Sequence, residues 1–212
     1  MFKNLFKKLN ENYYIYIAVI FICIPLNLMP QLMDGVYIDY AFNINDISGL
    51  EIWYKDASRI FHLYIIYIIK FLSDYTLISA EIFLDNFIFI FLILFSLEIK
   101  KYSKILFNLE DRWANLSALF VIIFPVWHTT IDFDIGQYLI SIYFLFFGFR
   151  QFIKKRIVNI FLGILLIMIS FNVESNLSFL IGLALIFFLN KNENYNFTYF
   201  KLLIIIAASI IY

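Results

Sequence analysis

The stretch 34–59, DGVYIDYAFNINDISGLEIWYKDASR, is a polar segment between two long apolar runs. Its carboxylates lie along its whole length, at Asp34, Asp39, Asp46, Glu51 and Asp56. A chain this rich in apolar residues does not need such a segment in order to stay in a lipid environment. We therefore interpret 34–59 as an acidic loop outside the membrane and as the first place to look for chemistry.

The composition predicts the fold class. Apolar residues make up 63% of the 212-residue chain, and apolar runs long enough to span a bilayer recur along its whole length. We expect an all-α protein, a polytopic transmembrane helical bundle of about seven crossings plus one outer interfacial helix. The formal net charge is zero, so a nucleic-acid partner has no electrostatic support.

The apolar runs give the order of the helices. The predicted crossings are 13–33, 82–99, 114–131, 136–152, 157–171, 177–190 and 199–212. The run 60–73 is shorter, and a helix of that length spans only about 21 Å, so we expect it to lie in the outer interface rather than cross. The chain reads as one transmembrane domain, 1–212. Because its last apolar run is cut off by the end of the sequence, we expect it to be the N-terminal part of a longer protein.

Basic residues orient the bundle. They gather in segments 100–112, 150–156 and 191–201, whereas the alternate connections 127–135 and 172–176 contain no lysine or arginine. The positive-inside rule places the basic segments in the cytoplasm together with the N-terminus. We therefore expect an integral protein of the bacterial inner membrane whose acidic loop lies outside. A full crossing by 60–73 would reverse either the N-terminus or the rest of the chain.

With this orientation, polar side chains collect on the outer face. The acidic residues and the histidine expected there are Asp34, Asp39, Asp46, Glu51, Asp56, Asp74, Glu81, His128, Asp132, Asp134 and Glu174. The cations expected there are Lys55, Arg59 and Lys70. Such a surface suits a carboxylate acting as a general base, carboxylates holding a divalent cation, or a cation holding a phosphate.

Each candidate also has a purely structural interpretation. Asp34 precedes a glycine, and this dipeptide is common in turns. His128 follows a tryptophan and suits an interfacial side chain. Asp132 and Asp134 suit the N-cap of the next helix, and Glu174 suits the capping and dipole of the helix after the 172–176 turn.

The layout of the chain resembles a known enzyme family. The segments that carry the resemblance are DGVY at 34–37, RIFH at 59–62, DFDIGQY at 132–138 and SFNVES at 170–175. In this order they resemble the GT-C glycosyltransferases, whose first helix leads into an outer loop that has an acidic motif and juxtamembrane helices. Two departures are plain: Val173 stands where the family's turn has lysine, and the acidic motif is Asp-Gly rather than Asp-Glu.

The resemblance implies transfer of a sugar from a polyprenyl-phosphate donor to a cell-envelope acceptor, which could be a glycan, a lipid or a protein. It implies Asp34 as the catalytic base, with Asp39 as its competitor, and Arg59 and Lys55 at the donor phosphate. Members of the family differ in metal use. A site for Mg²⁺ or Mn²⁺ would use some of four carboxylates, Asp34, Asp39, Asp132 and Asp134.

A second function fits the same features. A membrane protein that translocates or presents a glycolipid without catalysis would also need an acidic outer surface and contacts with membrane lipids. It would equally keep Asp85, a carboxylate inside an apolar run, where insertion costs ~2.5 kcal/mol or more. Consumption of a lipid-linked donor separates the two functions.

Overall fold

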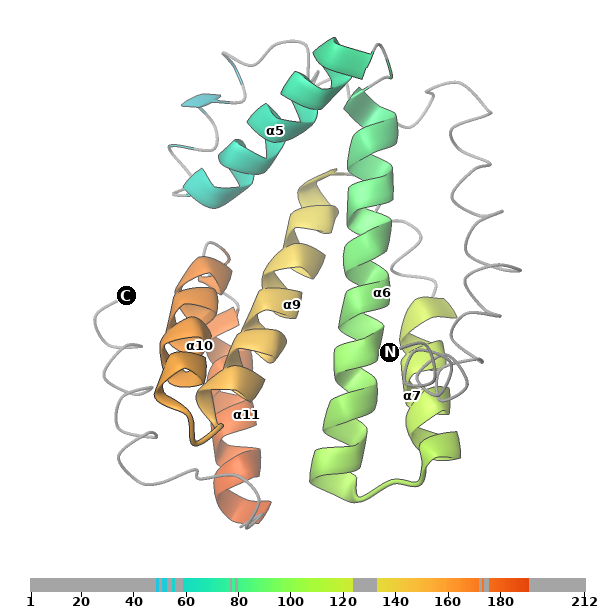
Figure 1. The fold of residues 1–212 in the computed structure, drawn as a ribbon, viewed down its shortest axis with the longest axis vertical. Helices are drawn as coiled ribbons and strands as arrows, with labels where there is room; N and C mark the ends of the chain where they lie inside the picture. Colours follow the sequence, from blue (N-terminus) through green and yellow to red (C-terminus); the bar gives the residue numbers. More distant parts are fainter. Residues whose placement is uncertain are drawn as a thin grey trace. The chain divides into compact units, whose positions relative to one another are not determined.

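The computed structural model describes six helices (Figure 1). The described residues are 49, 51–52, 55, 59–76, 78, 80–123, 133–171, 173 and 176–190. Within them almost every residue is helical, which confirms the all-α part of the predicted fold class. The expected helices 13–33 and 199–212 lie outside the described residues.

None of the helices in the described part of the chain is both long enough and apolar enough to be a candidate membrane span.

The chain divides into two compact units, Met1–Leu139 and Ile140–Tyr212. The boundary falls inside α9, which runs from Phe133 to Phe152. The first unit contains α5, α6 and α7 together with the first residues of α9. The second unit contains the rest of α9 with α10 and α11.

Helix α5, Ile60–Thr76, begins at the expected residue and ends three residues later than expected. One side is buried in the protein and consists of His62, Leu63, Ile65, Ile66 and Ile69. The opposite side is also apolar but exposed, and its residues are Ile60, Tyr64, Ile68, Phe71, Leu72 and Tyr75. Because both sides are apolar, α5 has two surfaces that water solvates poorly, and the protein covers only one of them.

Helices α6, Ala80–Phe107, and α7, Asp111–Ile123, pack side by side as a hairpin (Figure 1). The segment 100–107, expected as part of a connection, continues α6 instead. The helix ends at Phe107. The next residue, Asn108, has a left-handed φ of 49°, a conformation that asparagine tolerates better than most residues. Ala118 and Ile122 of α7 are fully buried against Phe89 and Leu97 of α6.

Opposite charges join the two ends of the α6–α7 turn. Lys104, in the last turn of α6, forms an ion pair with Asp111, in the first turn of α7. Each charge is on the favourable end of its helix dipole. The hydrogen bond from Lys104 lowers the pKa of the Asp111 carboxyl below its ordinary value. Both side chains are well exposed, so this pair defines the turn more than it stabilises the fold.

In the second unit, α9 and α10 (Ile157–Ser170) touch at two glycines. A Cβ added to Gly163 would lie 2.5 Å from the backbone nitrogen of Phe152 and 2.7 Å from the carbonyl oxygen of Gly148. Close backbone approach through small residues is a common way for helices to pack in membranes. The third helix, α11 (Asn176–Asn190), contacts α9 through the edge-on rings of Phe149 and Phe187, 5.3 Å apart.

Candidate functional site

Arg59 is the residue from which α5 starts. Its carbonyl oxygen accepts hydrogen bonds from the backbone nitrogens of His62 at 3.1 Å and Leu63 at 3.4 Å. These bonds fix the backbone of Arg59 to the first turn of the helix. Arg59 is the last residue of the acidic loop and directly precedes α5. Its side chain is partly exposed.

The guanidinium of Arg59 contacts Tyr138, which lies 79 residues later in the chain. Nη2 of Arg59 donates a hydrogen bond to the Tyr138 hydroxyl at 3.3 Å. The Cζ atom also lies 5.6 Å from the centroid of the Tyr138 ring, which is within the range of a cation–π interaction. The two contacts restrict the direction in which the cation points.

Tyr138 is in the second turn of α9, and Asp134 is one turn before it in the same helix. Helix α9 starts at Phe133, so the expected 136–152 element begins three residues earlier and includes Asp134. The structure therefore brings Arg59, at the end of the acidic loop, next to Tyr138 of α9, at the end of the stretch DFDIGQY. Both segments were expected at the outer face.

Lys55, the second expected phosphate contact, has a carboxylate neighbour. Its Nζ atom is 3.5 Å from Glu51, one helical turn earlier. The two side chains are 61% and 36% exposed, so water and salt screen the pair. Lys55 thus shares its charge with Glu51.

His62 is completely buried. Its ring meets the ring of Phe61 edge-on, with the centroids 5.9 Å apart. It lies on the protein-facing side of α5 and belongs to the interior, not to the exposed surface.

Asp34, Asp39, His128, Asp132 and Glu174 lie outside the described residues, and Asp134 is described by its backbone alone. The predicted Mg²⁺ or Mn²⁺ site of Asp34, Asp39, Asp132 and Asp134 falls almost wholly outside them too. Among the side chains that the structure describes, no group of three or more histidine, cysteine, aspartate or glutamate residues could hold a metal ion.

Buried hydrogen bonds stabilise the turn between α10 and α11. Asn176, which is buried, donates from Nδ2 to the carbonyl oxygen of Ser170 at 2.8 Å. The Ser170 hydroxyl donates in turn to the carbonyl oxygen of Ile167 at 2.6 Å. Val173 is only 2% exposed. The side chain of Val173 therefore serves packing.

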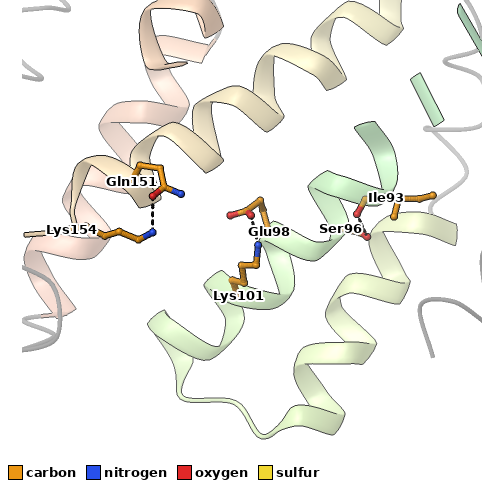
Figure 2. Close-up of polar contacts among 6 residues, drawn as sticks. All are labelled: Ile93, Ser96, Glu98, Lys101, Gln151 and Lys154. Atoms are coloured by element: carbon orange, nitrogen blue, oxygen red, sulfur yellow. Dashed lines mark hydrogen bonds and ion pairs between the residues drawn. The ribbon is translucent and has the colours of Figure 1, made fainter. Parts of the chain in front are cut away.

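A buried carboxylate lies near the end of α6. Glu98 has a side chain that is 3% exposed and accepts a hydrogen bond at 2.6 Å from Lys101, as Figure 2 shows. The pair neutralises a charge that would be costly to bury alone. In the second unit, Lys154 donates to the Gln151 side chain at 2.6 Å (Figure 2). Two of the basic residues used to orient the bundle thus bond to neighbours one turn earlier.

Comparison of the chain with models of known protein families, with curated proteins and with solved structures found no match.

Proposed function

We propose that this protein is a membrane glycosyltransferase that moves a sugar from a polyprenyl-phosphate donor to a cell-envelope acceptor at the outer face. The contact between Arg59 and Tyr138 carries the proposal. A partly exposed cation with two directional contacts at the end of an acidic loop is suited to a phosphate group. The acidic loop supplies carboxylates on the same side, and one of them is the base.

The exposed apolar side of α5 supports a position at the membrane surface. Its tyrosines, Tyr64 and Tyr75, are 61% and 82% exposed, and tyrosine is enriched where lipid tails meet headgroups. Helix α10 contains no charged residue, and it exposes Ile157, Val158, Phe161, Leu162, Leu165 and Met168. Contiguous apolar surface of this kind needs a lipid or protein neighbour.

The basic end of α6 supports the proposed orientation. The last turn of the helix carries Lys104 and borders the basic α6–α7 connection, and basic residues favour the cytoplasmic side of a membrane.

The proposed reaction is a single displacement. The acceptor hydroxyl attacks the anomeric carbon from the face opposite the phosphate, and Asp34 takes its proton. The new carbon–oxygen bond forms as the bond to the phosphate oxygen breaks, and polyprenyl phosphate leaves with the electron pair. Arg59 binds the phosphate, both in the donor and in the leaving group. The product has an inverted anomeric centre.

Donor consumption tests the proposed function. Membranes that contain the protein are expected to convert a labelled polyprenyl-phosphate sugar, tested from a panel of sugars, to free polyprenyl phosphate and a glycosylated acceptor. Membranes without the protein are the control. If every donor stays intact, or crosses the bilayer without being cleaved, the transferase proposal is wrong. The second of these results would favour glycolipid translocation.

Cysteine labelling tests the orientation. In a Cys23→Ser background, Asp46→Cys is expected to react with a membrane-impermeant maleimide in intact cells. Lys104→Cys is expected to react only after permeabilisation, because the basic end of α6 lies in the cytoplasm. The opposite pattern would invert the topology and remove the proposed outer site.

A further inference from the structure

We infer that Tyr138 is a positioning residue that holds the Arg59 guanidinium for binding the phosphate of an apolar-chain donor. The inference rests on the proposed function for its ligand and on the structure for its geometry. The sequence pattern assigned Tyr138 no role beyond the end of the DFDIGQY stretch. In the structure it is the side chain that contacts Arg59 from α9.

The two contacts have different physical consequences. The hydrogen bond at 3.3 Å fixes one edge of the guanidinium, because the hydroxyl oxygen is an acceptor at one place. The ring, 5.6 Å from Cζ, attracts the cation through its π face and is less specific about direction. Together the hydrogen bond and the ring limit the directions in which the guanidinium can point.

Positioning matters because a free arginine side chain samples many rotamers. Binding an anion would freeze them, and that entropy cost weakens the affinity. A side chain held beforehand has already lost part of this freedom. Tyr138 is 40% exposed and Arg59 is partly exposed, so the pair remains accessible to a ligand from outside the protein.

Equilibrium binding of polyprenyl monophosphate in detergent micelles tests the inference. We expect Arg59→Ala to weaken binding about tenfold or more, the loss of one charge-assisted contact. Tyr138→Phe, which keeps the ring and removes the hydroxyl, is expected to weaken binding by ~3–10-fold. In the Arg59→Ala background, Tyr138→Phe is expected to have no further effect, because it acts only through Arg59.

Two controls make the result specific. Polyprenol, which lacks the phosphate, is expected to bind the wild type and the Tyr138→Phe variant equally. Tyr75→Phe removes the hydroxyl of an exposed tyrosine at the other end of α5 and is expected to bind polyprenyl monophosphate as the wild type does. In the transfer assay, Tyr138→Phe is expected to raise the donor KM and leave kcat unchanged.

The outcomes separate the inference from the proposed function. The positioning role would be overturned if the wild type did not bind polyprenyl monophosphate. It would also be overturned if Arg59→Ala and Tyr138→Phe lowered the affinity additively in the double variant. If the two substitutions lower the affinity non-additively but no donor is consumed in the transfer assay, the positioning role holds and the proposed transferase activity is wrong. A fall in kcat with an unchanged KM would also overturn the positioning role, because Tyr138 would then act on the chemical step.

Discussion

Replacement of Asp34 by asparagine is expected to lower the rate of sugar transfer by ~10²–10⁴-fold, the usual cost of losing a general base. The asparagine keeps the shape of the side chain and removes its ability to take a proton. Asp34 directly follows the first apolar run, so we expect its carboxylate at headgroup level. A donor anchored by its polyprenyl chain presents its anomeric carbon at that same level.

Asp39→Asn is the matched variant for this measurement. It makes the same chemical change five residues later in the same loop. We expect it to retain most of the activity, measured as initial rates of donor consumption in membranes with equal amounts of protein. Full activity of Asp34→Asn with an inactive Asp39→Asn would move the base to Asp39. Full activity of both variants would exclude a carboxylate base at this end of the loop.

Gly163→Ala is expected to destabilise the α9–α10 hairpin by about 1–3 kcal/mol, the typical cost of overpacking. The new Cβ would lie 2.5 Å from the Phe152 nitrogen and 2.7 Å from the Phe152 Cα. Both atoms belong to the backbone and cannot rotate away as a side-chain tip could, so the two helices must separate. The separation loses packing that the alanine's better helix propensity, worth ~1 kcal/mol, does not restore.

Gly182→Ala is the matched control, because it makes the same change in α11, where no atom lies within 4 Å of the added Cβ. It is expected to leave the melting temperature of the purified protein unchanged or to raise it through helix propensity. The melting temperature of Gly148→Ala is expected to lie between those of the other two variants. The atom closest to its added Cβ is the Leu166 Cβ, a side-chain atom at 2.9 Å. Equal melting temperatures for Gly163→Ala and Gly182→Ala would mean that the helices do not touch at Gly163.

The sequence located most of the helices because their signals are local. The apolar runs predicted the starts of α5 and α10 to the residue, and α11 began within one residue of its expected start. The predicted helix ends were wrong where charged residues were interpreted as a connection between helices. Segment 100–107 carries lysines, yet lysine has a good helix propensity, and α6 continues through it.

The contact of Arg59 with Tyr138 was not predictable from the sequence. Arg59 was singled out because a cation at the end of an acidic loop suits a phosphate. That it contacts Tyr138 could not be read from the sequence, since 79 residues separate them and only the path of the chain brings them together. The same holds for His62, whose burial depends on which side of α5 meets the protein.

The sequence by itself determined the helical class and the order of the helices, because apolar runs and their breaks act over a few residues. Only the tertiary structure decided which polar groups meet. Tyr138 meets Arg59, Asn176 meets the Ser170 carbonyl, and Gly163 meets the backbone of α9. Each of these contacts joins one helix to another element or spans a turn. Packing decides which two residues meet in each contact, and a linear pattern of residues does not encode that packing.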